Sequence, residues 1–209
     1  MSNPRVLDPQ GSYTFSKYYE LNYDSEEVFA ELGCSFENTE LTLPVSTEPI
    51  PFVEGLSERL DFALRFTNLT SEMARREMLI APILSAVCAH AHQKLRIEYK
   101  VDVNEQLKGS IDYFIPGSQN LLVVEAKNAD ISRGFTQLGA ELIALDQWTQ
   151  EKTPLLYGIV TTGDVWKFGL FLRTERKILK DINIYSVPSE LEKLLSILLG
   201  IIQPSPVSA

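Results

Sequence analysis

The sequence predicts an α/β fold, in which helices pack on a sheet, and three observations support this prediction. Apolar residues recur at steps of three and four after residue 55, which is typical of a helix packed on a core. Alternating segments lie between residues 96 and 125, as expected of strands. A second helical pattern and another short apolar run follow, so helices and strands alternate along the chain as they do in α/β folds.

We predict one folded domain over residues 55–202. The chain of 209 residues is long enough to bury one good core. Residues 1–54 resemble an N-terminal appendage that does not fold alone, with a short helix over 26–32 and prolines that interrupt the segment 44–51. Residues 203–209 are expected to be a disordered tail.

The first helical pattern extends from Leu56 to about Leu95. Its predicted core-facing stripe consists of Met73, Ile80, Leu84, Val87 and Ala91. Glu77 takes the vacant place in this stripe, so we expect a carboxylate on the core-facing side, where it needs a partner or a metal ion. Pro82 lies inside the pattern and should kink or split the helix.

Three strands, a helix and a fourth strand are predicted next. The three strands cover the alternating or apolar segments 96–103, 109–115 and 121–125. Asp130 is expected to cap the helix, whose apolar face consists of Ile131, Phe135, Leu138, Leu142 and Leu145. The remaining predicted elements are strands over 155–160, 165–172 and 182–187 and a helix over 190–202.

Charged side chains end two of the predicted strands. Asp112 stands near the end of one strand, and the apolar run after residue 120 ends in Glu125, Ala126 and Lys127. Burying a charge costs on the order of several kcal/mol unless the charge is paired or binds a metal ion. Carboxylates and a lysine at the ends of adjacent strands therefore predict a divalent-metal site with a cation beside it.

The residue types suit hydrolysis of a phosphodiester. Asp112 and Glu125 supply the hard oxygen ligands that Mg²⁺ or Mn²⁺ prefers, and the backbone carbonyl of Ala126 is a further candidate ligand. Lys127 is two residues after Glu125 and so points to the same side of the strand, where it would either assist the attacking water by lowering the pKa of a metal-bound water or stabilise developing negative charge. Glu77 would reach the site from the helix and support a second metal ion or the attacking water.

These residues resemble the motif of the PD-(D/E)XK nuclease superfamily, which has the restriction-endonuclease-like fold. The core of that family is a helix, three antiparallel strands, a helix and a further strand, which roughly matches residues 70–162. In the family a helix glutamate, a strand aspartate and an E-x-K triplet form the metal site. The residues at the matching places are Glu77, Asp112, Glu125 and Lys127.

The resemblance extends to the following helix and has two departures. A glutamine on that helix often contacts the site or DNA in the family, and Gln137 matches it. The proline of the family name is Ile111 here, and Glu141 stands where the helicase-associated branch has tyrosine. The resemblance implies an endonuclease that depends on Mg²⁺ or Mn²⁺ and cleaves duplex or branched DNA, with Gln137 among its catalytic residues.

The charge of the chain leaves other interpretations open. The net charge of −9 argues against a general nucleic-acid coating protein, and residues 1–93 carry most of this acidity, with 6 basic and 14 acidic side chains. One alternative is a catalytically inactive nuclease fold that serves as a DNA-binding or protein-interaction module. Another is an accessory subunit of a restriction or repair complex. Either a partner subunit or a homodimer through residues 190–202 is expected.

The sequence also predicts a cytoplasmic protein. No apolar run approaches the roughly 18 to 20 residues needed to span a bilayer. The first residues lack the apolar segment of a secretory signal. Cys34 and Cys88 are too few for a disulfide framework or a zinc cluster.

Overall fold

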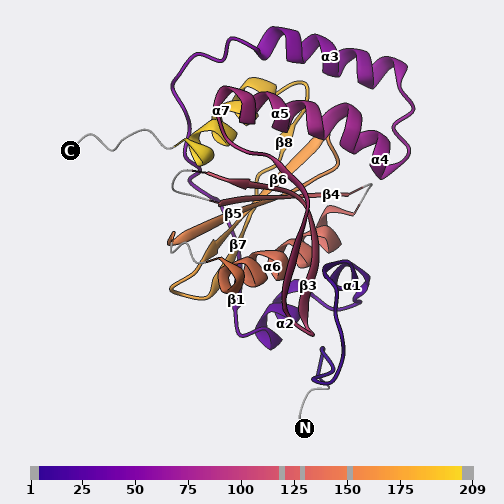
Figure 1. Ribbon diagram of the computed structural model, residues 1–209, viewed down its shortest axis with the longest axis vertical. Helices are drawn as coiled ribbons and strands as arrows, with labels where there is room; N and C mark the ends of the chain where they lie inside the picture. The colour runs from indigo at the N-terminus through magenta and orange to yellow at the C-terminus, as the bar shows by residue number, and fades with distance from the viewer. Residues whose placement is uncertain (1–4, 118–120, 128–129, 150–152, 204–209) are drawn as a thin grey trace, which may run out of the picture.

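A computed structural model describes residues 5–117, 121–127, 130–149 and 153–203. The described residues form one mixed sheet of eight strands with helices on both faces, which confirms the predicted α/β class (Figure 1). The strand order is β1-β7-β6-β5-β4-β3-β2, and β8 pairs with β6. The strand bounds are β1 Ser35–Thr39, β2 Arg96–Asn104, β3 Leu107–Pro116, β4 Leu121–Ala126, β5 Leu155–Thr161, β6 Val165–Leu172, β7 Lys177–Asp181 and β8 Tyr185–Ser186.

One half of the sheet, from the edge strand β2 to β5, has the order expected from the sequence. Strands β2, β3 and β4 are consecutive antiparallel neighbours, and β5 pairs in parallel with β4 after the crossover through helix α6. A parallel neighbour requires such a crossover connection. The predicted turn before β4 includes residues 118–120, which lie outside the described residues.

Helices divide into two layers, one on each face of the sheet. Their bounds are α1 Phe15–Glu20, α2 Ser25–Glu31, α3 Val53–Phe66, α4 Glu72–Arg75, α5 Ala81–His90, α6 Ile131–Trp148 and α7 Leu191–Ile202. In Figure 1, α3, α5 and α7 lie above the sheet, whereas α1, α2 and α6 lie below it. Two separate hydrophobic clusters fill the two interfaces between helices and sheet.

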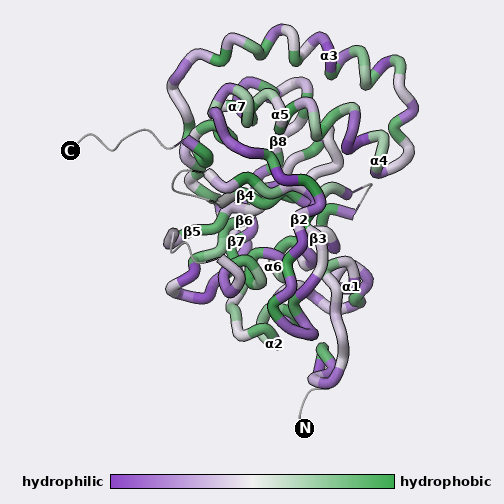
Figure 2. The backbone as a smooth tube through the Cα atoms, in the orientation of Figure 1, coloured by the Kyte–Doolittle hydropathy of each residue, from purple (hydrophilic) through white to green (hydrophobic). Residues whose placement is uncertain are grey.

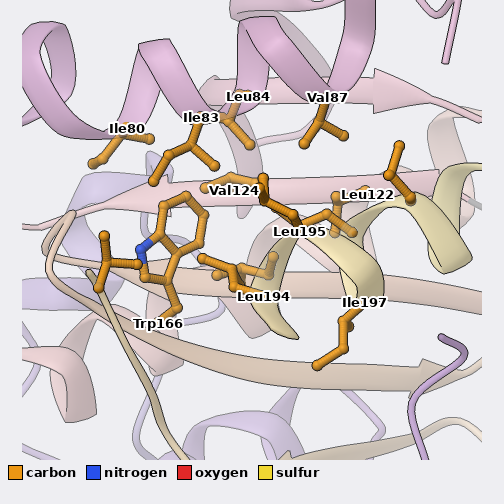
Figure 3. Packing of buried hydrophobic residues seen from close by; sticks show 14 of the residues in the cluster. Ile80, Ile83, Leu84, Val87, Leu122, Val124, Trp166, Leu194, Leu195 and Ile197 are labelled. Atoms are coloured by element: carbon orange, nitrogen blue, oxygen red, sulfur yellow. The ribbon is translucent and has the colours of Figure 1, made fainter. Parts of the chain in front are cut away.

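The upper cluster packs α5 and α7 against the middle strands. Figure 3 shows Ile83 and Leu84 of α5 above Val124 of β4, with Leu194 and Leu195 of α7 beside them. Figure 2 shows hydrophilic and hydrophobic positions alternating along the outer helix α3. The apolar side chains of α7 are buried within this chain, so this helix does not offer them as the predicted dimer interface.

The long helical stripe predicted after Leu56 is interrupted and changes phase. Helix α3 ends at Phe66, and a π-helical turn over Arg76–Ile80 joins α4 to α5. In that turn the amide of Ala81 donates to the carbonyl of Arg76, five residues earlier rather than four. Pro82, which has no amide hydrogen to donate, follows at the start of α5.

The extra residue of the π-helical turn rotates the preceding helix face. Ile80 and Leu84 are fully buried as predicted, but the side chain of Met73 is 70% exposed and Glu77 is exposed. The expectation that Glu77 lies on the core-facing side of the helix is therefore wrong. Because the π-helical turn contains one residue more than an α-helical turn, a residue earlier in the chain takes the core-facing position that was predicted for Glu77.

Residues assigned to the N-terminal appendage contribute to the same body. Strand β1 pairs in parallel with β7 along one edge of the sheet, and no strand was predicted there. The predicted short helix is confirmed as α2, with Asp24 in a capping box. The last predicted strand, 182–187, is confirmed only at its two residues Tyr185–Ser186, which form β8, and the longer strand β7 lies before it and was not predicted.

The C-terminal helix lies close to its predicted position. Helix α7 begins one residue after its predicted start and ends at Ile202 as expected. Of the predicted tail, residues 204–209 lie outside the described residues. None of the helices in the described part of the chain is long and apolar enough to cross a membrane.

We expect Gly139→Ala to destabilise the protein because Gly139 lets α6 approach α2. A methyl group at this position would overlap ring carbons of Phe29, which is fully buried. Overpacking of this kind costs about 1 to 3 kcal/mol, which urea denaturation would measure. The matched control is Gly55→Ala on α3, where a Cβ meets no atom within 4 Å. This control should be neutral or stabilising, and equal stability of the two variants would contradict the packing argument.

Candidate functional site

A cavity of about 410 Å³ brings together most of the residues predicted for the site. Asp112 of β3, Glu125 and Lys127 at the end of β4, and Gln137 of α6 all line it. The other lining residues are Thr14, Phe15, Ser16, Glu72, Gly109 and Ser110. The N-terminal segment therefore forms one wall of this cavity.

Asp112, which was predicted near the end of its strand, lies in the middle of β3, and the antiparallel pairing of β3 and β4 sets it beside Glu125. The adjacent residues Tyr113 and Val124 are register partners, so Asp112 and Glu125 are opposite one another in the same ladder. Oδ2 of Asp112 accepts a hydrogen bond of 2.9 Å from the backbone N–H of Ala126. Ala126, whose carbonyl was predicted as a ligand, is fully buried and does not line the cavity.

Lys127 makes a buried ion pair with Glu125. Its Nζ lies 2.5 Å from Oε1 of Glu125, and the two side chains are 11% and 2% exposed. Gly134 of α6 faces the stem of the lysine, since a Cβ there would lie 2.8 Å from Cγ of Lys127. The ring of Tyr19, from α1, lies 5.0 Å from Nζ on another side. The ammonium group is thus held between β4, α6 and α1.

Gln137 connects Glu125 to a second buried carboxylate. Its Nε2 donates to Oε1 of Glu125 over 2.6 Å and to Oε1 of Glu141 over 2.9 Å. Glu141 is fully buried, although the sequence predicted no role for it in the site. Its burial could have been predicted, because Glu141 lies three residues after Leu138 and four before Leu145 on the apolar face of α6.

The buried carboxyl groups hold protons more tightly than exposed ones. Burial, together with the negative charge of Asp112, raises the pKa of Glu125 to about 7, although Lys127 acts in the opposite direction. Burial and the proximity of Glu125 raise the pKa of Glu141 well above its ordinary value. We infer that Glu141 carries the proton and donates it in a hydrogen bond to Glu125.

Lys127 remains charged in this environment. Burial disfavours the ammonium form, but the attraction of Glu125 and its hydrogen bond outweigh burial and raise the pKa of Lys127 above the ordinary value. Glu72 and Asp112 contribute to the same effect. The site therefore holds a fixed positive charge beside its carboxylates.

Glu72, rather than Glu77, is the helix carboxylate of this cavity. It begins α4 directly after the cap residue Ser71, whose side chain accepts from the amide of Ala74. Glu77 lines a neighbouring cavity and does not line the one that contains Asp112. The spacing of apolar residues did not identify Glu72, because it gives no signal for the π-helical turn that follows Glu72.

Arg76, which was not predicted to belong to the site, forms an ion pair with Oδ1 of Asp112. Its Nη1 lies 3.2 Å from Oδ1 of Asp112, and its Nη2 lies 2.6 Å from Oε1 of Glu98. Burial raises the pKa of Asp112, while Arg76 and the amide of Ala126 counteract that rise. Both oxygens of Asp112 thus have partners within the protein.

The donor set fits a hard divalent cation in chemistry and charge. Within the described chain, three buried oxygens of this cluster lack a hydrogen-bond donor: Oε2 of Glu125, Oε1 of Gln137 and Oε2 of Glu141. With Glu141 protonated, three charged carboxylates face two cationic side chains here, an excess of negative charge that Mg²⁺ or Mn²⁺ would offset. Among the described residues, no three acidic, histidine or cysteine side chains are already grouped as metal ligands.

Comparison with known proteins adds no assignment, because neither a protein-family model nor a curated protein matches the chain. The site must therefore be interpreted from its own geometry.

We expect a Glu141→Gln variant to change how stability depends on pH. The folded-state pKa of Glu141 lies above its ordinary value of 4.5, so the folded chain binds a proton that the unfolded chain releases. The associated stability is present below the unfolded-state pKa and is lost as the pH rises through the folded-state pKa. Glutamine has no proton to lose, and its amide can donate to Glu125 in the same way.

Thermal melting would measure this effect. The variant should match the wild type at about pH 5 and melt about 3 °C higher at about pH 9. Glu58→Gln on the exposed face of α3 controls for loss of a carboxylate. A melting difference between Glu141→Gln and the wild type that stays constant with pH would show that Glu141 is not protonated in the fold.

Proposed function

We propose that the protein is a metal-dependent DNA endonuclease of the PD-(D/E)XK type, which hydrolyses phosphodiester bonds. The observation that carries the proposal is the convergence of Glu72, Asp112, Glu125 and Lys127 in one cavity. A helix and two adjacent strands supply these residues, although they are separated by up to 55 positions in the sequence. A buried lysine beside acidic oxygens is suited to a reaction in which negative charge develops on phosphate.

The order of elements supports the same proposal. Helices α4 and α5 are followed by the antiparallel strands β2, β3 and β4, and then by α6 and β5. This is the element order that the resemblance to the restriction-endonuclease-like core implies. Gln137 supports it further, because its amide contacts the carboxylate of the E-x-K triplet directly.

Asp112 and Glu125 would hold Mg²⁺ or Mn²⁺, whereas Ala126, whose carbonyl was the further predicted ligand, does not line the cavity. A bound cation would supply Lewis-acid chemistry, in which it polarises the phosphodiester and stabilises the leaving oxygen. Holding a cation at Asp112 would require Arg76 to release Oδ1, the oxygen with which it now pairs. The freed guanidinium group would then be available for a phosphate oxygen.

The protein groups around this position would organise the attack of water on phosphorus. The water loses a proton to solvent as its oxygen forms the new P–O bond in line with the P–O bond that breaks, and the leaving alkoxide takes up a proton from solvent. Lys127, fixed by Glu125, would stabilise the charge that develops on the phosphate oxygens. Glu72 would orient water or support a second cation, while Gln137 holds Glu125 in position.

The accessory-subunit interpretation remains the second candidate, and one observation favours it. The chain has a net charge of −9, whereas a nuclease that binds DNA alone generally presents a basic surface. In that case a partner chain would supply the contacts to the DNA backbone. Cleavage of DNA by the isolated chain decides between the two functions.

We expect Lys127→Ala to abolish cleavage. Supercoiled, linear and branched DNA would each be incubated with Mg²⁺ or Mn²⁺ and with either the wild type or the variant, purified identically. Loss of the fixed ammonium group should lower the rate by about a hundredfold or more, and a chelator should abolish the wild-type activity. Equal cleavage by both proteins would exclude this site, and absence of cleavage by either would favour the accessory-subunit function.

The helix carboxylate has its own test. Glu72→Gln should lower the cleavage rate by about tenfold or more, because the variant loses a charge that acts on the same cavity as Asp112 and Lys127. Glu58→Gln, on the exposed face of α3, is the matched control and should retain the wild-type rate. Equal rates for the two variants would remove Glu72 from the site.

A further inference from the structure

A second cavity lies directly beside the candidate active site. It measures about 430 Å³, and Glu72 lines both cavities. Arg76 also connects them, because it lines the second cavity while its Nη1 contacts Asp112 of the first. A molecule bound at Asp112 and Glu125 would therefore lie next to this second cavity and could extend into it.

The walls of the second cavity are flat or apolar. Met73 and Ile97 line it, and their side chains are 70% and 56% exposed. The guanidinium group of Arg76 lies over the ring of Tyr113, with its central carbon 5.3 Å from the ring centroid. Apolar side chains and a guanidinium plane are the surfaces on which unstacked nucleobases pack.

Three carboxylates also line this cavity, and they restrict what it accepts. Glu98 pairs with Arg76, and Glu77 is exposed. Glu72 is the third. Carboxylates accept hydrogen bonds from amino groups, as when glutamate reads the N4 amino group of cytosine. They repel phosphates and carbonyl edges, so a neutral ring that carries an amino group fits this cavity better than a phosphate does.

We propose that this cavity binds an unpaired nucleobase with an exocyclic amino group, from the strand whose phosphate occupies the Asp112–Glu125 site. The proposal rests on the proposed function for the position of that phosphate. A base inside a continuous duplex cannot enter such a cavity unless it leaves the stack. The preferred substrate is therefore single-stranded or contains an unpaired cytosine, adenine or guanine beside the cleaved bond.

Binding of short oligonucleotides without metal tests the proposal. Fluorescence anisotropy in EDTA would compare oligodeoxycytidylate with oligothymidylate of equal length. We expect the cytosine strand to bind about tenfold more tightly, because thymine presents a carbonyl where cytosine presents an amino group. Ile97→Ala should weaken binding of the cytosine strand about fivefold, since base contacts with such walls are each worth about that much or more.

Ile182→Ala provides the matched control. Ile182 is 58% exposed, close to the 56% of Ile97, and lines neither of the two cavities. This variant should bind both strands as the wild type does. Equal affinity for the two strands, no binding of either strand, or equal effects of the two alanine variants would each overturn the proposal.

The outcome separates this proposal from the nuclease function. Preference for cytosine without cleavage of any DNA would leave the base site intact and reject the nuclease. Metal-dependent cleavage of DNA, together with equal binding of the two strands in EDTA, would support the nuclease and reject the base site. Melting curves for Ile97→Ala would confirm that a change of binding does not arise from unfolding, since Ile97 lies exposed on the edge strand β2.

Discussion

The buried ion pair between Glu125 and Lys127 is the constraint on which the rest of the site depends. A carboxylate that is 2% exposed is tolerated because Lys127 and Gln137 both donate to its Oε1. The same requirement brings α6 close to β4, with Gly134 against the lysine stem. It also explains the proton assigned to Glu141, because a second buried negative charge on α6 would otherwise have no compensation.

The candidate site is assembled from parts of the chain that are far apart in the sequence. Phe15 closes one side of the cavity from the N-terminal segment, and Tyr19 of the same segment lies over Lys127. That segment is attached to the sheet by the hydroxyl of Tyr18, which donates to the carbonyl of Gln106 over 2.7 Å. The short N-terminal helix α1 thus forms part of the wall of the site.

Arg76 couples the two cavities through one side chain. It neutralises Asp112 on one side and Glu98 on the other, and it stacks over Tyr113. A phosphate at the first cavity and a base at the second would both compete for this arginine. Arg76 is the first residue of the π-helical turn, so this local change of helix geometry determines where its side chain lies between the two cavities.

The sequence by itself determined the order of the elements from α5 to β5 and four members of the candidate site, since apolar periodicity and charged residues within apolar segments are local signals. It identified Asp112, Glu125, Lys127 and Gln137 but selected Glu77 in place of Glu72, because a π-helical turn alters the phase without altering composition. Only the tertiary structure decided the burial of Glu141, the pairing of β1 with β7, and the contact of Arg76 with Asp112. These features depend on contacts between distant segments, which no local pattern of residues encodes.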